Sequence, residues 1–473
     1  MDLGLADFAV DYAIKLGASY ADARMESTSN SGFLLRNGVP QISGFDRVTG
    51  LGLRVIVNNT LGFVSINQIE KEKVRTLVER GMKVTKNAAR IKEEIKLSDE
   101  EVHEDKYEVK QKINLEDASP AEKLSVLLEI EKAVESSGIK VPGSYLSLSD
   151  FTTQKYFVNS YGAKIESKIP RTDYFFFLTV KENGKSGQRY WQYGAAGGFE
   201  TILDKDFPGL MLNEVKTTAK MLKDGVKPPK GKIDLVVGPQ VTGIMVHESA
   251  GHPHEADRIF GREAAQAGES YLTKDNLGSA IGNEIVNISD DPTIEGSFGY
   301  YLYDDEGVRA RKKALIKNGI SNELLHNRET AEALRVKSNG SARATSYDRE
   351  AIVRMSNTFL EEGDHKEEEL IEGVKKGVYM KNFTEWNIDD RRVNQKYVGS
   401  EAYIIENGKI TAPAFMPTIE IKTHDLWRAV DAIADNTEHS AGTCGKAEPM
   451  QAIPVWFGGP SFRMRGIRLS EYP

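Results

Sequence analysis

The first part of the chain alternates between a helical and a strand-like spacing of apolar positions. Leu5, Phe8 and Tyr12 stand at helical spacing ahead of Gly17, which predicts an amphipathic helix that ends at the glycine. A hairpin around Asn37-Gly38 is predicted at 32–42, and another strand at 51–57. A second helix is predicted at 69–90. The range 1–92 is therefore predicted to be a small α+β module.

A second unit opens on a charged stretch and a clear helix start. Residues 92–111 are dominated by Glu and Lys, which predicts a solvated connector. Ser119, Pro120 and Glu122 then supply an N-cap, a first-turn proline and a capping-box acid. The buried stripe of this helix is predicted at Leu124, Leu127, Leu128 and Val134. Together with a hairpin signal at Asn183-Gly184, this pattern predicts a middle α+β module at 93–226.

The remainder of the chain predicts one large, mainly antiparallel β domain at 227–473. The segment 226–232 is rich in Pro, Gly and Lys, which is typical of a linker. A short apolar strand at 233–237 and a short helix at 241–251 follow it, and Asn318-Gly319 and Asn407-Gly408 mark later hairpins. The predicted fold class is therefore α+β and multi-domain, with two small modules ahead of the large C-terminal domain.

Composition and charge argue against several classes of protein. The chain has 473 residues, of which 40% are hydrophobic, and a net charge of -8. No basic stripe with interleaved aromatic residues occurs, so we expect no nucleic-acid partner. The N-terminus has no basic region ahead of an apolar one, and apolar runs such as 174–180 are too short to span a bilayer. We therefore expect no membrane partner and a cytoplasmic location.

Two glycine-containing stretches resemble nucleotide-binding motifs but do not meet their requirements. Gly184-Lys185-Ser186 matches the end of a phosphate-binding loop, yet that motif needs a glycine where Thr179 stands. The stretch 194–198 lacks the spacing of a dinucleotide fingerprint. We predict a turn at the first stretch and a loop at the second.

Histidine is concentrated in one place, since three of the eight histidines lie between positions 247 and 254. Histidine is the commonest metal ligand in proteins. His247 and His252 are five residues apart, which on a straight α-helix leaves their side chains roughly 140° apart. Gly251 favours a helix end, and Pro253 disfavours a helical backbone at the residue before it. We therefore expect His247 in the last helical turn, and His252 on an extended exit that folds back.

A catalytic zinc site with two histidines needs a third protein ligand, because such sites usually have three and leave one position open. Cys444 is the single cysteine of the chain, and it lies among small residues in a predicted loop at 441–446. Its thiolate is our preferred third ligand. His254, Glu255 and Asp257 are the competing candidates, and their alternative interpretation is a supporting or surface position. A lone cysteine is often only a small buried apolar residue.

Glu248 directly follows the first histidine and is the acid best placed for proton transfer. Beside a metal-activated water it would accept a proton and pass it to a leaving amine. The alternative interpretation is a solvated position on the helix.

Other charged residues are given simpler interpretations. Arg343, Arg349 and Arg354 are candidates for binding a peptide carboxylate, although pairing with nearby acids such as Asp348 is the commoner role of such arginines. The acidic run 304–306 is interpreted as a solvated turn rather than a hard-cation site.

The motifs, taken in order, resemble those of the TldD/PmbA family over nearly the whole chain. Residues 50–56 with Gly62-Phe63 resemble its N-terminal signature, and residues 247–257 resemble its metal motif. Further blocks follow in the family's order at 303–307, 354–358, 406–409 and 442–446. Because the His-Glu-x-x-x-His motif is kept, the chain is similar to the TldD-like branch, and the PmbA/TldE-like branch lacks that motif. Pro253 and His254 depart from the family pattern. We expect this difference to affect the first substrate subsite and to leave the metal ligands unchanged.

The resemblance implies a zinc-dependent metallopeptidase whose metal site lies in the C-terminal domain. It implies unstructured peptide substrates, zinc (Zn2+) bound by His247, His252 and Cys444, and Glu248 as general base. It also implies a dimer, either of two copies or with a TldE/PmbA-like subunit. Two alternatives stay open: a zinc hydrolase of a non-peptide amide, and a non-catalytic partner subunit. The many short strands of the C-terminal domain favour a strand edge beside the metal, to which an extended peptide can add.

Overall fold

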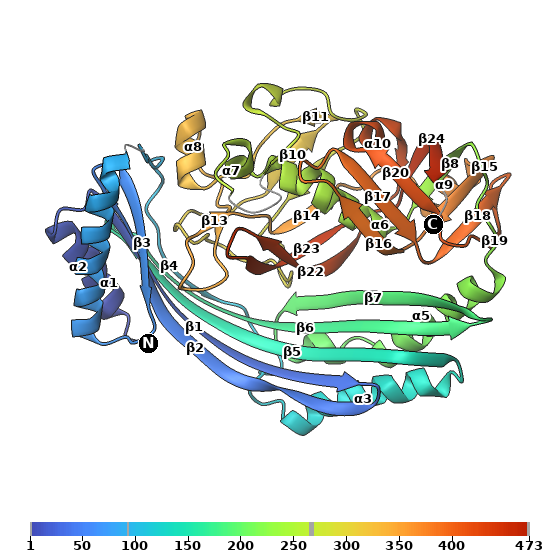
Figure 1. Ribbon diagram of the computed structural model, residues 1–473, viewed down its shortest axis with the longest axis horizontal. Coiled ribbons are helices and arrows are strands. Elements are labelled where there is room, and N and C mark those ends of the chain that lie inside the picture. Colours follow the sequence, from blue (N-terminus) through green and yellow to red (C-terminus); the bar gives the residue numbers. More distant parts are fainter. Residues whose placement is uncertain (1, 92–93, 264–268, 471–473) are drawn as a thin grey trace.

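The computed structural model describes residues 2–91, 94–263 and 269–470. A long curved sheet from the first half of the chain lies against a C-terminal region built from smaller sheets (Figure 1). Most strand pairs are antiparallel, so the predicted α+β multi-domain fold with a mainly antiparallel C-terminal domain is confirmed. The predicted boundary between 92 and 93 lies outside the described residues, and the division into 1–92, 93–226 and 227–473 stays a prediction.

The long sheet combines strands from both N-terminal ranges. Its order is β3-β2-β1-β5-β6-β4, and β7 pairs with β6 beside this path. The bounds are β1 (Tyr20–Arg36), β2 (Val39–Val57), β3 (Thr60–Ile66), β4 (Glu104–Glu108), β5 (Lys140–Asn159), β6 (Lys164–Glu182) and β7 (Lys185–Ala196). Strand β4 pairs in parallel with β6. The stretch 92–111, predicted to be only a solvated connector, therefore contributes a strand to the sheet.

Asn-Gly pairs close hairpins at all four places predicted for them. The φ angles are 50° and 74° at Asn37-Gly38 and at Asn183-Gly184, and the pairs at 318–319 and 407–408 are likewise left-handed. Positive φ at both central residues matches the twist of the flanking strands. The phosphate-loop resemblance after Asn183 is therefore only a turn, as predicted. The predicted loop at 194–198 begins later than expected, because β7 continues to Ala196.

Strand β1 is buried on both faces because its side chains alternate between two environments. Ala21, Ala23 and Met25 lie in an apolar core with helices α1 (Gly4–Lys15) and α2 (Lys71–Ala88). The intervening charged side chains face the C-terminal region. Both helices lie at one end of the sheet (Figure 1).

Helix α3 (Pro120–Ser136) begins at the predicted capping box and buries Leu127 and Val134 of the predicted stripe, but not Leu128. The Ser119 hydroxyl accepts from the Glu122 N–H, and the Glu122 carboxylate accepts from the Ser119 N–H. Leu128 is 42% exposed, because the buried face runs through 123, 127, 130 and 134. Lys123 occupies the first of these positions, where its ammonium group lies 2.7 Å from Asp150. The buried face of the helix thus includes an ion pair that the predicted stripe did not contain.

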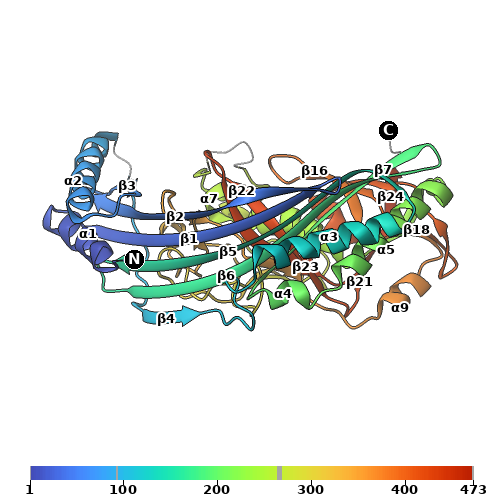
Figure 2. The same cartoon turned by 90° about the horizontal axis from the view of Figure 1, so that it is seen from below.

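Helix α5 (Phe207–Asp224) lies beside α3 along the outer face of the long strands (Figure 2). The short helix α4 (Glu200–Leu203) precedes it. The segment 226–232 then leads from α5 to β8 (Lys232–Val237) without regular structure beyond one bridge at Val226, which agrees with the predicted linker.

Buried ion pairs join the long sheet to the C-terminal region. Arg54 of β2 lies 2.5 Å from Glu306, and Lys155 of β5 lies 2.5 Å from Asp305. The run 304–306 is buried, so the prediction of a solvated turn is wrong. The cations that make this burial tolerable come from strands more than a hundred residues away in the chain.

The glycines of the N-terminal signature make room for a loop of the C-terminal region. A Cβ at Gly50 would lie 2.1 Å from the ring of Tyr347, and a Cβ at Gly52 would lie 2.2 Å from its carbonyl oxygen. Arg24 of β1 donates to the carbonyl of Ser346 at 2.9 Å. The signature therefore serves the contact between the two regions of the molecule.

The C-terminal region contains a six-stranded sheet, a nine-stranded sheet and a two-stranded one. The orders are β11-β10-β9-β14-β23-β22, then β16-β17-β20-β24-β8-β15-β18-β19 with β21 paired to β24, and β12-β13. The first sheet comprises β9 (Ile288–Asp290), β10 (Lys313–Lys317), β11 (Ile320–Ser321), β14 (Asn357–Leu360), β22 (Glu438–Lys446) and β23 (Gln451–Gly459). The second adds β15 (Lys376–Met380), β16 (Phe383–Ile388), β17 (Asn394–Gly399), β18 (Ala402–Glu406), β19 (Lys409–Pro413), β20 (Thr418–Lys422), β21 (Val430–Ile433) and β24 (Phe462–Ser470) to β8. The third pairs β12 (Ala342–Arg343) with β13 (Ile352–Val353).

Helix α6 (Pro239–Val246) follows β8 directly and packs on the six-stranded sheet. The remaining helices are α7 (Ala256–Ile259), α8 (Arg328–Leu334), α9 (Glu367–Glu372) and α10 (Thr423–Ala429). Within the part of the chain that the structure describes, no helix has both the length and the apolar character needed to cross a membrane.

Candidate metal centre

The helix that carries the histidine motif changes its hydrogen bonding at His247. Helix α6 continues into a π-helical turn, η2 (His247–Gly251), and then a 3₁₀ turn, η3 (His252–His254). The His252 N–H bonds to the His247 carbonyl, which is the i to i+5 bond of a π turn. His252 has φ −56° and ψ −41°, so the expected extended exit is wrong. The wider turn instead brings residues five apart onto one side of the helix.

Close packing explains how a helical backbone persists up to Pro253. The sulfur of Met355 fills the space beside Gly251, where a Cβ would lie only 1.9 Å from it. Gly251 has φ −58°, so its backbone is helical rather than left-handed. The glycine is therefore needed for space at this position, and not for the backbone freedom expected from the sequence.

Side chains satisfy the backbone groups that the irregular turn leaves available. The Tyr271 hydroxyl donates to the Ser249 carbonyl at 3.0 Å, and His254 Nδ1 lies 2.6 Å from the Ala250 carbonyl oxygen. The Trp427 indole donates to the Ser249 hydroxyl at 3.1 Å. Because buried carbonyl groups need donors, these contacts stabilise the π turn and fix the positions of the histidines on either side of it.

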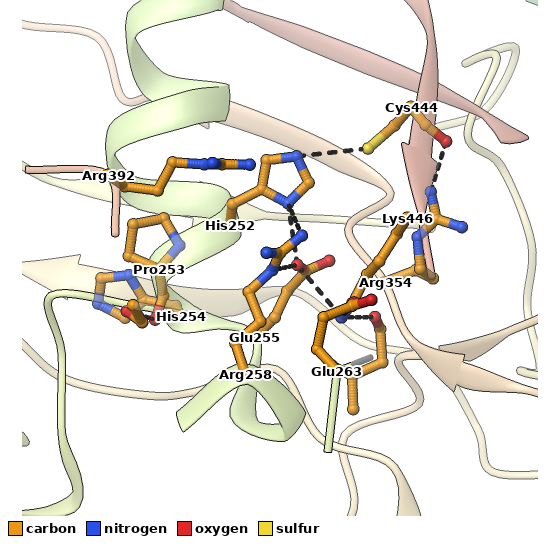
Figure 3. Close-up of polar contacts among 12 residues, drawn as sticks. His252, Pro253, His254, Glu255, Arg258, Glu263, Arg354, Arg392, Cys444 and Lys446 are labelled. Atoms are coloured by element: carbon orange, nitrogen blue, oxygen red, sulfur yellow. Dashed lines mark hydrogen bonds and ion pairs between the residues drawn. The ribbon is translucent and has the colours of Figure 1, made fainter. Parts of the chain in front are cut away.

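The structure brings His247, His252 and Cys444 together. One ligand atom from each lies within 4.8 Å of the other two, and all three side chains are buried. Cys444 Sγ is 3.5 Å from His252 Nε2 (Figure 3). Among the described residues, His247 Nδ1 has no hydrogen-bond partner despite its burial. An unpartnered nitrogen, a second imidazole and a thiol form a donor set that fits zinc.

Glu255 orients the ring of His252. Glu255 Oε2 lies 2.9 Å from His252 Nδ1, which leaves Nε2 facing Cys444 (Figure 3). Arg258 Nε and Lys446 Nζ lie 2.7 Å and 3.3 Å from the same oxygen. Burial opposes the ionisation of Glu255, but Lys446, His252 and Arg258 hold its pKa well below the usual value. A carboxylate behind a ligating histidine fixes its tautomer, so Glu255 is placed as a supporting group.

The other two competing ligand candidates bind elsewhere. The Asp257 carboxylate accepts from Lys446 Nζ at 2.7 and 2.9 Å. His254 Nε2 lies 3.2 Å from the Ser321 hydroxyl, and burial lowers the pKa of His254 to about 4. Neither residue is among the described side chains that line the cavity beside His247. Pro253 is also absent from that lining. The two residues that depart from the family pattern, Pro253 and His254, are therefore not part of the cavity wall.

Cys444 lies on strand β22, and not on the loop expected at 441–446. Arg354 donates to the carbonyls of Cys444 and Gln451, the latter at 2.8 Å. Burial raises the pKa of the Cys444 thiol, but His252 and Arg354 outweigh this and lower it to about 7. A thiol with a lowered pKa readily supplies the thiolate that a metal requires.

The three arginines considered as carboxylate-binding groups have structural partners. Arg349 lies 2.7 Å from Asp348, as predicted for an acid pair. Arg343 instead donates to the carbonyls of Met355 and Pro454 at 2.8 and 2.9 Å, and Arg354 also binds backbone carbonyls. Their guanidinium groups hold the strands around the site together.

The candidate ligands open into a cavity of about 430 Å³. Its apolar lining includes Phe175, Tyr190, Trp191, Phe383, Trp386 and Phe457. The walls come from β7, β16 and β22, and each of these strands lies at an edge of its sheet among the described strands. Three edge strands therefore surround the place where the ligands meet.

Glu248 lines the same cavity and is 8% exposed, so it is not a solvated helix position. Glu248 Oε2 has no hydrogen-bond partner among the described residues, and Arg392 Nε lies 3.4 Å from it. Burial alone would raise the pKa of Glu248, but His252, His247 and Arg392 hold it below its usual value. Arg392 was not singled out from the sequence, because no spacing relates it to the histidine motif.

Sequence profiles of one family match most of the chain. The PmbA/TldA metallopeptidase domain 1 matches residues 21–85, the central domain of that family matches 113–223, and its C-terminal domain matches 230–471. The third match alone contains the histidine motif and Cys444.

Curated relatives and a solved structure agree with these profiles. A metalloprotease of Methanocaldococcus jannaschii is 35% identical over 452 residues, covering 94% of this chain and 95% of its own length. A zinc metalloprotease TldD homolog of Saccharolobus solfataricus is 26% identical over 463 residues, covering 97% and 98%. TldE of Thermococcus kodakarensis shares the fold with a TM-score of 0.76 at 17% identity, covering 99% and 100%. With this extent of matching, the chain belongs to the PmbA/TldD metallopeptidase family.

Proposed function

We propose that this protein is a zinc-dependent peptidase that hydrolyses unstructured peptides. The observation that carries the proposal is the buried cluster of His247, His252 and Cys444, which shares a cavity with Glu248. Close relatives named metalloprotease, one of them a zinc metalloprotease, support the same activity. In this proposal the three clustered residues bind zinc, and Glu248 is the general base.

The division of roles follows from what each side chain offers. Zinc, when bound, supplies a Lewis acid that polarises the scissile carbonyl and makes water more acidic. Glu248 accepts the proton from the attacking water and returns it to the leaving amine. Glu255 keeps the ring of His252 oriented through its Nδ1 contact. The aromatic lining excludes bulk water from the reacting groups, which strengthens electrostatic interactions inside the cavity.

The edge strands around the cavity support an extended peptide as the substrate. Strands β7, β16 and β22 each pair with another strand on one side only among the described strands, and β22 carries Cys444 itself. A peptide that adds to such an edge gains backbone hydrogen bonds, and its alternate side chains enter pockets. The apolar lining favours apolar side chains next to the scissile bond. A non-peptide amide would use few of these features.

Assembly is the second part of the proposal. We propose that the chain forms a homodimer, or a heterodimer with a TldE/PmbA-like subunit. Presence of the complete donor set and of Glu248 disfavours the role of a non-catalytic partner. The molar mass measured by light scattering, alone and with a TldE-type chain, tests this part, and a monomer in both samples would refute it.

The purified protein is expected to contain about one zinc ion per chain, because the described residues hold one buried set of three ligands. Exhaustive chelation should abolish hydrolysis of a short unstructured peptide, and added zinc should restore it. Elemental analysis alongside the peptide assay measures both quantities. A metal-free protein with full activity would rule out the zinc mechanism.

One protein offered in two forms tests the substrate class. We expect ribonuclease A to be cleaved when reduced and carboxymethylated, and its native form to be cleaved ~1000-fold or more slowly. The reason is that a stable protein exposes extended backbone only in an unfolded fraction of ~10⁻³ or less. Fragment formation is measured by mass spectrometry, with a short peptide present in both reactions as an activity control. Equal cleavage of both forms would contradict a site that binds its substrate as an added β-strand.

A further inference from the structure

Arg392 is held in an unusual backbone conformation at the rim of the metal cavity. It lies in the turn between β16 and β17 and has φ 61°, a value uncommon for a residue with a side chain. The Asp389 carboxylate fixes this turn by accepting the N–H groups of Val393 and Asn394 at 2.8 and 2.9 Å. The Thr423 hydroxyl also donates to the Arg392 carbonyl. The surrounding structure therefore imposes the conformation, which is typical of functional positions.

The side chain of Arg392 is directed inward, although its neighbours in the turn are exposed. Arg392 is 7% exposed and lines the cavity with Glu248, His252 and Cys444, whereas Arg391 is exposed. In Figure 3 the guanidinium group points toward the ring of His252. One of its donors, Nη1, is used by the Asp389 carbonyl at 3.2 Å. The strained turn thus places a cation beside the candidate metal ligands.

Two buried polar atoms at this place lack hydrogen-bond partners among the described residues. One is the donor Arg392 Nε, and the other is the acceptor Glu248 Oε2. They form an ion pair at 3.4 Å, but not a hydrogen bond. Because buried polar atoms without hydrogen bonds are costly, a donor and an acceptor that lack them in one cavity indicate a polar ligand that contacts both. A peptide carbonyl supplies an acceptor for the first atom, and the water that attacks it supplies a proton for the second.

We propose that Arg392 is a catalytic residue that donates a hydrogen bond to the oxygen of the scissile carbonyl; this rests on the peptidase function proposed above. As the water oxygen bonds to the carbonyl carbon, the π electron pair moves onto the carbonyl oxygen, and Glu248 takes a proton from the water. The negative oxygen then faces the guanidinium group. When the C–N bond breaks, its electron pair goes to nitrogen, which receives the proton from Glu248.

The chemistry of arginine suits this role. A guanidinium group stays protonated at any pH at which the protein is folded, so it cannot compete with Glu248 as a base. Its fixed donors stabilise charge where it develops, which is the requirement for lowering the barrier. The distance of 3.4 Å to Glu248 places the donor beside the proposed base. A subsite for a distant peptide carboxylate would lie further from Glu248.

The test uses binding of a transition-state mimic to the zinc-loaded protein. The probe is the phosphinic peptide Ac-Ala-Ala-Phe-ψ[PO2CH2]-Leu-Ala-NH2, whose phosphinate oxygen replaces the carbonyl oxygen under attack. Its affinity is measured by calorimetry for Arg392→Gln in two backgrounds, the unchanged protein and Glu248→Gln. We expect a loss of about 100-fold in both backgrounds, as for the removal of an oxyanion donor. The kcat for peptide hydrolysis should fall by a similar factor with little change in KM.

The two backgrounds separate a direct contact from an indirect one. A loss that disappears in the Glu248→Gln background would show that Arg392 acts only by positioning Glu248, and would overturn the proposal. Unchanged affinity in both backgrounds would also overturn it. Should Arg392→Gln not fold, Arg392→Lys carries the same comparison, with a smaller loss expected because the charge is retained. Failure of the proposed function differs, since the unchanged protein would then neither cleave peptides nor bind the probe.

Arg391→Gln is the matched control for this experiment. Arg391 precedes Arg392 in the same turn, and its side chain lies at the surface 3.6 Å from Glu269. The control removes one guanidinium charge from the same turn without touching the cavity. Probe affinity and kcat should stay within about twofold of the unchanged protein, as for surface substitutions in general. A loss equal to that of Arg392→Gln would assign the effect to the turn, and so overturn the proposal.

Discussion

Replacing Glu248 by glutamine is expected to lower turnover of a peptide substrate by on the order of a hundredfold or more. The amide has nearly the same shape as the carboxylate but cannot accept a proton from water. Glu248 is the only carboxylate among the described residues that line the cavity, so no second base stands ready to replace it. The measurement is kcat at saturating peptide, with zinc content determined on the same preparation.

The control for this substitution is Glu385→Gln on β16. Glu385 is paired with Lys396 at 3.0 Å and is not part of the cavity lining. Loss of a carboxylate there should leave kcat unchanged. If Glu248→Gln retained kcat within a few fold while keeping its zinc, the general base would have to be sought elsewhere. If zinc were lost as well, the substitution would be reporting on the metal site rather than on proton transfer.

Local chemistry in the sequence predicted the beginnings and turns of elements well. The start of α3 at Ser119 and the four Asn-Gly hairpins depend on residues within a few positions of one another. Errors occurred where a distant partner decides the outcome. Lys123, which was not predicted to be buried, is buried because Asp150 lies opposite it on β5. The acidic run 304–306 is buried because Arg54 and Lys155 reach it from the long sheet.

The histidine motif also combines a feature that nearby residues predict with one that distant residues decide. The sequence predicted that His247 and His252 would face one another, and the structure places them so. The sequence did not predict the π turn that achieves this, because the turn depends on packing that lies far along the chain. Met355 fills the space beside Gly251, and Tyr271 bonds to a carbonyl inside the turn. Local propensities at Gly251 and Pro253 favoured a helix end, and tertiary contacts overrode them.

The remaining parts of the site follow from topology alone. Cys444 lies on an edge strand of one sheet and Arg392 in a turn between two strands of another, and only the packing of those sheets brings them to the histidines. Single cysteines can be picked out by their rarity, but one arginine among many offers no such signal. The strand edges that line the cavity are also a property of sheet order, since a strand does not reveal in its own sequence whether a neighbour pairs with it.

Replacing Cys444 by alanine is expected to reduce zinc affinity by a hundredfold or more, and to abolish peptide hydrolysis with it. A thiolate is among the strongest zinc donors, and even loss of a group that only supports a ligand costs ~10–100-fold in affinity. No described neighbour can take its place, because Glu255 is bound to His252 Nδ1 and Asp257 to Lys446. Zinc is titrated against a competing chelator and measured in the Cys444→Ala protein and in Ser440→Ala, a control on the same strand that lies off the cavity. Full zinc occupancy in Cys444→Ala would mean that the third ligand is His254, Glu255 or Asp257 after a rearrangement of the turn.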